Sequence, residues 1–109
     1  MRSTQQHILS LVEQKAREVA STILAGEIRV HVFAFGSRAS GHASPRSDID
    51  VGIDIGHAIA AEILVALREA FDELPILQKV DVVDFCSLEE SFKAVAGQHT
   101  MTLYARQAA

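Results

Sequence analysis

The chain has 109 residues, of which 49% are hydrophobic and 22% charged, and its formal net charge is −4. This length supports one domain, residues 1–109, with a hydrophobic core, and the composition excludes a disordered chain. The few cations are scattered, which argues against direct binding of long nucleic acid. Cys86 is the only cysteine, so an intrachain disulfide is excluded, and we interpret its thiol as a small buried hydrophobe.

The N-terminal segment begins an amphipathic pattern rather than the apolar core of a signal peptide. No apolar stretch approaches the roughly 20 residues that a membrane-spanning helix needs. We therefore expect a cytoplasmic protein that does not contact a membrane.

The first half of the chain predicts one helix and two strands. Apolar residues recur at three- and four-residue steps over 4–25, which predicts a helix with Thr4 as N-cap and Gly26 as stop. Residues 28–35 are rich in β-branched and aromatic side chains and predict a strand. A turn-rich segment, 36–47, leads to a second strand over 48–55, where apolar and polar residues alternate.

The second half predicts a helix, a strand and a further helix. The helix covers 58–73, ends at Pro75 and buries a stripe formed by Ile59, Ile63, Leu64, Leu67 and Phe71. A third strand follows over 77–85. The spacing of Ser87 and Glu90 is typical of a capping box, so a third helix is expected from there to about Gln98. The last ten residues are expected to form a short helix or a tail.

The predicted element order is therefore α-β-β-α-β-α. It indicates an α+β fold, an α/β two-layer arrangement in which helices flank a short mixed β-sheet.

Two carboxylates share one face of the second predicted strand. Side chains alternate along a strand, so Asp48 and Asp50 point to the same side while Ile49 points into the core. Adjacent carboxylates repel each other, and a divalent cation such as Mg²⁺ or Mn²⁺ removes that repulsion. Taken alone, the short motif would favour two solvent-facing aspartates.

Two other segments favour the functional interpretation. Gly36-Ser37 ends the first strand at a turn, where backbone N–H groups can approach a phosphate. Arg38 adds a cation beside them, although a solvated loop arginine is at least as good an interpretation. Asp81 interrupts a Val-rich strand, which is costly without a partner, and can join the other carboxylates if its strand lies beside theirs. Asp84 falls on the opposite face and is expected to interact with the next helix.

These features together resemble the signature of the polymerase β-type nucleotidyltransferases. Gly36-Ser37, ten further residues and Asp48-Ile49-Asp50 form the stretch GSRASGHASPRSDIDVGI, and the strand KVDVVDF follows. The resemblance covers roughly residues 8–92 and is greatest to the minimal nucleotidyltransferases, or MNT proteins. It implies a nucleotidyltransferase that moves AMP from ATP with two Mg²⁺ ions, or Mn²⁺ in their place.

The resemblance also implies roles for six residues. Catalysis and metal binding would fall to Asp48, Asp50 and Asp81, with Asp81 nearest the attacking hydroxyl. Nucleotide binding would fall to Gly36, Ser37 and Arg38. His42 lies in the same loop, and a surface histidine is the simpler interpretation of it.

The resemblance further implies a helical HEPN-type partner protein encoded nearby, with the MNT chain as antitoxin of a toxin–antitoxin pair. MNT antitoxins neutralise that partner by transferring AMP to a tyrosine near its RNase site and by binding it. Larger relatives carry an added acceptor domain, for which 109 residues leave no room. A homodimer or hetero-oligomer is therefore expected. Two alternatives stay open: a catalytically weak binding module that covers its partner, and a transferase acting on a small molecule.

Overall fold

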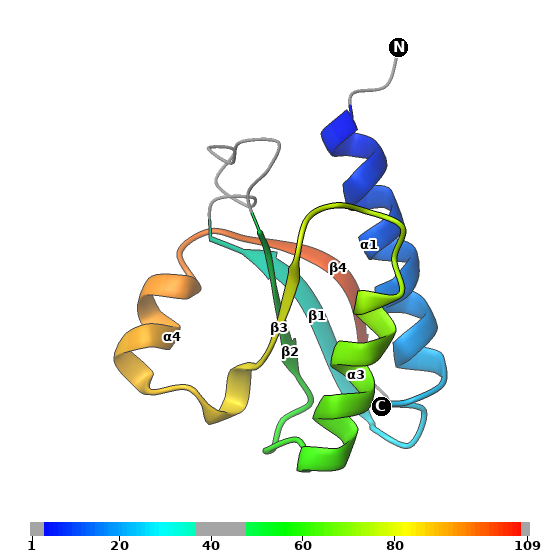
Figure 1. Ribbon diagram of the computed structural model, residues 1–109. Helices are drawn as coiled ribbons and strands as arrows, with labels where there is room; N and C mark the ends of the chain where they lie inside the picture. Colours follow the sequence, from blue (N-terminus) through cyan, green and yellow to red (C-terminus); the bar gives the residue numbers. More distant parts are fainter. Residues whose placement is uncertain (1–3, 37–47, 108–109) are drawn as a thin grey trace.

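The computed structural model describes residues 4–36 and 48–107 and folds them into a mixed sheet with helices on both faces (Figure 1). The elements, in chain order, are α1 (Thr4–Ser21), β1 (Arg29–Phe35), β2 (Ile49–Asp54), α3 (Ala61–Asp72), β3 (Val80–Asp84), the 3₁₀ turn η1 (Phe85–Ser87), α4 (Glu90–Ala96) and β4 (Thr100–Gln107). No described helix is long and apolar enough to cross a membrane.

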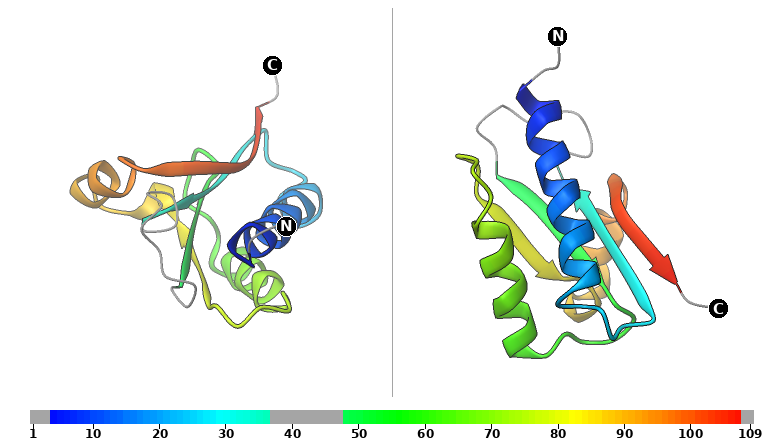
Figure 2. Two further views of the ribbon diagram at one scale, coloured as in Figure 1. Left: turned by 90° about the horizontal axis from the view of Figure 1, so that it is seen from above. Right: turned by 90° about the vertical axis from the view of Figure 1, so that its right-hand side faces the viewer.

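The four strands lie in the order β3-β2-β1-β4. β1 pairs antiparallel with β2 and with β4, whereas β2 and β3 are parallel. The two long helices α1 and α3 cover one face of this sheet, and α4 lies against the other (Figure 2). The predicted α+β class with a short mixed sheet is confirmed.

The last strand corrects one prediction. Residues 100–107 form β4 rather than a short helix or a tail, and they pair along the whole of β1. Thr100, Thr102 and Tyr104 have side chains that favour strands, and Leu103 alone in this segment is buried. The physical reason for the strand is tertiary, because β1 would otherwise leave one row of backbone hydrogen-bonding groups unpaired.

The start of the last helix corrects a second prediction. α4 begins at Glu90 after Glu89, and no side chain caps its N-terminus, so the expected capping box does not form. Ser87 lies in η1, and its hydroxyl donates instead to Asp84 Oδ2 at 2.7 Å. The Ser87 hydroxyl, which the sequence pattern predicted to cap the helix, thus binds the buried Asp84 carboxylate instead.

The other helix boundaries shift by a few residues. α1 ends at Ser21, and turns fill the interval to Gly26. α3 begins at Ala61, three residues after the predicted start, and Ile59 is buried ahead of it. Leu67 and Phe71 form the fully buried part of the predicted stripe.

The alternation predicted for β2 is confirmed and divides the strand between two environments. Ile49, Val51 and Ile53 have no exposed surface and pack beneath α1 and α3. The opposite side of the sheet holds a second, aromatic cluster built on Phe33 and Phe35. Gly52 permits that cluster, since an added Cβ would lie 2.6 Å from the Phe33 ring. The even-numbered positions of β2 therefore face the other side of the sheet, which is less covered and partly polar.

Candidate active site

Asp50 and Asp81 are neighbours on this second surface. The parallel register of β2 and β3 pairs them directly, so their side chains leave the sheet on the same side. Asp48 is exposed and immediately precedes β2. The structure therefore pairs Asp50 with Asp81 and places Asp48 near enough to Asp50 to raise its pKa, while the chemical roles of the three carboxylates stay predictions.

The charges around Asp50 are unfavourable in the protein alone. Burial raises the pKa of the Asp50 carboxyl, and the nearby Asp81 and Asp48 carboxylates raise it further. Lys79 Nζ lies 3.4 Å from Asp81 Oδ1, and its side chain is largely exposed. Within the described part of the chain, no group gives Asp50 a hydrogen bond or an ion pair. A positive charge bound here would therefore relieve a real electrostatic cost.

Gly36 lies against the same carboxylate. Its φ of 75° is in the left-handed region, which favours glycine, and a Cβ on it would lie 3.1 Å from Asp50 Oδ2. Both observations disfavour any residue other than glycine at this position. The end of β1 is thus held close to the carboxylates, as a phosphate-binding turn requires. The companions Ser37, Arg38 and His42 lie outside the described residues, so their roles stay predictions.

The donor set fits a hard divalent cation. No three His, Cys, Asp or Glu side chains among the described residues are grouped closely enough to hold a metal ion by themselves. Mg²⁺ does not need such a cage, because it usually keeps several waters and takes one or two carboxylates together with substrate phosphates. The all-oxygen set of Asp48, Asp50 and Asp81 and the raised pKa of Asp50 agree with that mode of binding.

Two cavities open on either side of Asp50. The larger, about 560 Å³, is lined by Asp81, Lys79, Arg68 and Phe92, among others. The smaller, about 360 Å³, is lined by Gly36 and by residues of α4. Asp50 lines both cavities. The sequence did not single out Arg68 or Phe92; Phe92 could have been noticed as a large apolar residue on the exposed face of a short helix.

Asp84 lies on the opposite face from Asp81, as predicted. It is buried, and its Oδ2 accepts hydrogen bonds from the Ile59 N–H at 2.9 Å and from the Ser87 hydroxyl. Its partners thus lie in η1 and in the segment before α3 rather than in α4. Asp84 ties the end of β3 to the helix-covered layer and does not face the cavities.

The surroundings of Cys86 also indicate a structural role for its side chain. Its thiol is partly buried and donates to Asp54 Oδ1 at 3.2 Å. Burial and the Asp54 carboxylate raise the pKa of the Cys86 thiol, which keeps it protonated. These contacts do not activate a nucleophile.

Comparison with known proteins gives a family match across most of the chain. The family described as "Polymerase beta, Nucleotidyltransferase" matches residues 14–109. The chain is also 34% identical over 64 residues to MntA of Haemophilus influenzae, which is named a probable protein adenylyltransferase. That alignment covers 59% of this chain and only 56% of MntA.

Solved structures show the same fold. A toxin–antitoxin structure with AMP-PNP matches with a TM-score of 0.61 and 21% identity, over 84% of this chain and 72% of that one. A candidate nucleotidyltransferase from Sulfolobus solfataricus matches with a TM-score of 0.58 and 26% identity, over 90% and 80%. A tri-AMPylated Shewanella oneidensis HEPN toxin in complex with MNT antitoxin matches with a TM-score of 0.50 and 18% identity, over 84% and 71%. Together with the family match and the paired carboxylates, these likenesses lead to one conclusion: the chain belongs to the polymerase β-type nucleotidyltransferase family.

Proposed function

We propose that this chain is a Mg²⁺-dependent protein adenylyltransferase that moves AMP from ATP to a hydroxyl group of a HEPN-type partner protein. The observation that carries the proposal is the registered pair of Asp50 and Asp81 with Gly36 packed against Asp50. The likeness to MntA supports protein as the acceptor class, and the structural neighbour with AMP-PNP supports an adenine nucleotide as donor.

The residues present suggest how the reaction would run. Asp48, Asp50 and Asp81 would hold Mg²⁺, which supplies charge neutralisation at the triphosphate and lowers the pKa of a bound hydroxyl. Backbone N–H groups at Gly36 and Ser37 would bind the β- and γ-phosphates, with Arg38 as a further phosphate ligand. The acceptor oxygen forms a bond to the α-phosphorus while the bond from that phosphorus to the β-phosphate oxygen breaks. Pyrophosphate leaves, and Asp81 accepts the hydroxyl proton.

The biological role follows from the proposed acceptor. As the MNT member of such a pair, the chain would act as antitoxin, and AMP on the partner would neutralise it. Two structural neighbours are toxin–antitoxin complexes, one of them an AMPylated HEPN toxin bound to an MNT antitoxin, which supports this role. A homodimer or a hetero-oligomer would present the acceptor to the cavities beside Asp50.

A labelling experiment tests this proposal. The purified chain is incubated with α-³²P-ATP, Mg²⁺ and the helical protein encoded beside it, with the Asp48→Asn/Asp50→Asn double variant as control. We expect label on the partner with the wild-type chain and none with the variant. A stable complex without any label would reject the transferase and support the binding-module alternative.

A further inference from the structure

The two paired carboxylates of the site differ in the partners that the chain gives them. Asp81 has a cation beside it, since Lys79 Nζ lies 3.4 Å from Asp81 Oδ1. Asp50 receives no such partner from the residues that the structure describes. Lys79 precedes Asp81 by two positions, which places the two side chains on the same side of the sheet. The lysine therefore directs its charge at the third carboxylate of the site.

The main chain of Lys79 is held in place, whereas its side chain is free to move. Lys79 immediately precedes β3, and its carbonyl oxygen accepts a hydrogen bond from the Ile49 N–H at 2.8 Å, at the start of β2. The Lys79 side chain is 70% exposed and the Asp81 side chain 38% exposed. An exposed pair of this kind is weak, because solvent screens it and the long lysine side chain loses entropy in it. The ammonium can therefore leave Asp81 without any change in the backbone.

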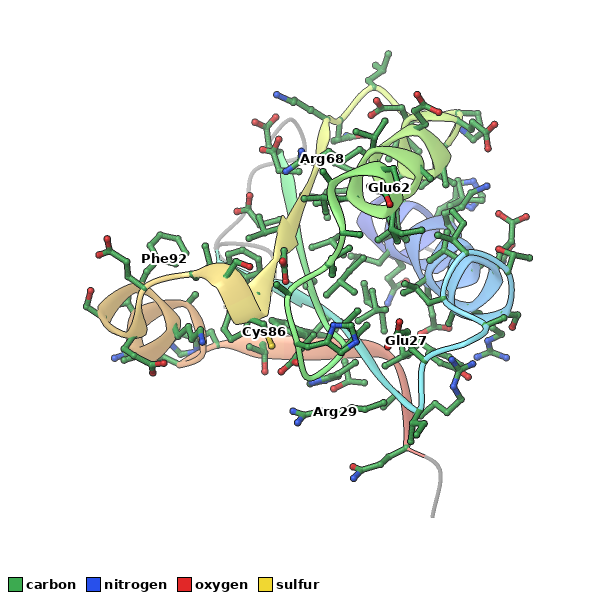
Figure 3. The ribbon with its side chains drawn as sticks, turned by 90° about the horizontal axis from the view of Figure 1, so that it is seen from below. Glu27, Arg29, Glu62, Arg68, Cys86 and Phe92 are labelled. Atoms are coloured by element: carbon green, nitrogen blue, oxygen red, sulfur yellow. The ribbon has the colours of Figure 1, made fainter. Side chains whose placement is uncertain are left out.

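Arg68 is the other cation that lines the cavity shared by Asp50 and Asp81. It comes from α3 (Figure 3), and its Nε and Nη2 both lie 3.3 Å from the Val82 carbonyl oxygen. This contact directs the guanidinium to the backbone of β3 rather than to a carboxylate. Within the described part of the chain, Lys79 is therefore the cation that forms an ion pair with this pair of carboxylates.

The Lys79 ammonium and a metal ion at the proposed site need the same carboxylate. Asp81 is one of the proposed metal ligands, and Mg²⁺ binds carboxylate oxygens directly, at roughly 2.0–2.1 Å. An ammonium left 3.4 Å from one of these oxygens would lie within a few ångströms of a divalent charge and be repelled by it. Metal binding at Asp81 therefore requires Lys79 to leave, and loss of the ion pair lowers the affinity for the metal.

A nucleotide changes this balance because it carries negative charge. When a metal ion alone displaces the ammonium, Lys79 exchanges its carboxylate partner for water. A metal–triphosphate complex brings phosphate oxygens, to which a lysine binds as a compact point charge with three donors. Lys79 lines the same cavity as Asp50, so a triphosphate held beside Asp50 would offer it such a partner. The loss of the ion pair is then offset for the complex and not for the free metal.

We propose that Lys79 is an exchangeable counter-ion of Asp81, and that it makes the site select a metal–nucleotide complex over the free metal ion. Lys79 pairs with Asp81 before the metal arrives and with the triphosphate afterwards. The inference rests on the proposed function, because it takes Asp81 as a metal ligand. It adds to that function a residue that regulates the order in which the site is filled.

Binding of Mn²⁺, followed by electron paramagnetic resonance, tests this role without any measurement of activity. Lys79→Gln removes the charge, and Lys79→Arg keeps it. Lys93→Gln is the matched control, since Lys93 Nζ lies 3.4 Å from Glu90 Oε1 and Lys93 lines neither cavity beside Asp50. We expect Lys79→Gln to bind Mn²⁺ alone about threefold more tightly than wild type, with Lys79→Arg and Lys93→Gln unchanged. With AMP-PNP present, Lys79→Gln should show no gain, or a loss.

Three results would overturn the inference. They are unchanged or weaker binding of Mn²⁺ alone in a folded Lys79→Gln variant, an equal gain in Lys93→Gln, and a gain that persists undiminished with AMP-PNP. Asp50→Asn separates these results from a failure of the proposed function. If Asp50→Asn binds Mn²⁺ with AMP-PNP as tightly as wild type, the proposed function fails and the inference fails with it. If Asp50→Asn loses Mn²⁺ and Lys79→Gln shows no gain, the inference alone fails.

Discussion

Asp50 and Asp54 lie on the same face of β2, four residues apart, and their surroundings shift their pKa values in opposite directions. Asp54 accepts hydrogen bonds from the Gly56 N–H at 2.8 Å and the Cys86 thiol, and it pairs with Arg29 at 3.1 Å. Burial alone would raise the pKa of the Asp54 carboxyl, but these partners together hold it below its ordinary value. Asp50 has carboxylates as neighbours, and its pKa is raised.

The difference separates a carboxylate whose partners are supplied by the fold from one that we propose binds a ligand. The partners of Asp54 are built into the chain, so its charge stabilises the fold without any ligand. Asp50 lies in a comparable position, but the described residues offer it no cation. The raised pKa of Asp50 shows that its surroundings disfavour the negative charge, and a bound cation would remove that cost.

The largest effect expected from this comparison is on transfer activity. Asp50→Asn removes a metal ligand, and loss of several kcal/mol of transition-state stabilisation corresponds to a rate lower by about a thousandfold or more. Asp54→Asn is the matched control on the same strand and face, and it should retain activity. Rates are measured with labelled ATP and the partner protein. Equal loss in both variants, with both folded, would remove the distinction between the two carboxylates.

A second pair of variants makes the same comparison on β3. Asp81→Asn should lower the transfer rate by about a hundredfold, because the group proposed to accept the proton is lost. Asp84→Asn should change the rate much less and should mainly lower the melting temperature, because it weakens the contacts to Ile59 and Ser87. Transfer rates and thermal unfolding are measured together. A larger rate loss at Asp84 would show that the wrong third carboxylate was chosen.

Gly36→Ala tests the turn that packs against Asp50. Alanine at a φ of 75° costs about 1–2 kcal/mol, and its Cβ would press on Asp50 Oδ2. We expect a transfer rate lower by about tenfold or more with a modest loss of stability. Gly26→Ala is a suitable control, since a Cβ there meets nothing within 4 Å. Unchanged activity in Gly36→Ala would show that close approach at this turn is not needed.

The smallest expected effect is on stability as a function of pH in the metal-free protein. The lowered pKa of Asp54 contributes stability that is present above its ordinary value of 3.8 and is lost as the pH falls through the folded pKa. The raised pKa of Asp50 has the opposite sign, since its cost is absent in acid and grows as the pH rises above 3.8.

At neutral pH with EDTA, Asp54→Asn should therefore lower the melting temperature and Asp50→Asn should raise it slightly. Both differences should shrink in acid. Thermal melts across pH 3–7 measure them, and a common sign for the two variants at neutral pH would contradict the electrostatic comparison.

The elements that could be predicted from the sequence are those fixed by local periodicity. The alternation in β2 was enough to place Ile49 in the core and Asp50 on the other face. The Val-rich pattern around Asp81 was enough to predict a third strand, and the structure adds that this strand is the parallel neighbour of β2. In each case side-chain period and burial favour the same arrangement, so tertiary contacts did not override the local signal.

The features that escaped prediction depend on contacts between distant segments. β4 forms because β1 has a free edge, and Arg106 then donates to the carbonyls of Ala20 in α1 and of Leu24 and Glu27 in the segment after it. Ser87 fits the sequence pattern of a capping box, yet its hydroxyl donates a hydrogen bond to the buried Asp84 carboxylate. The cavities that Asp50 lines also form only when α3 and α4 pack against the sheet. No local sequence pattern predicts such contacts between distant segments.

We propose that Asp50, and not Asp54, binds a divalent cation together with the nucleotide. The most direct measurement is Mn²⁺ binding, followed by electron paramagnetic resonance in the presence of AMP-PNP, for the wild-type chain, Asp50→Asn and Asp54→Asn. We predict that Asp50→Asn loses the tightly bound Mn²⁺ and that Asp54→Asn keeps it. Wild-type Mn²⁺ affinity in a folded Asp50→Asn variant would contradict the account.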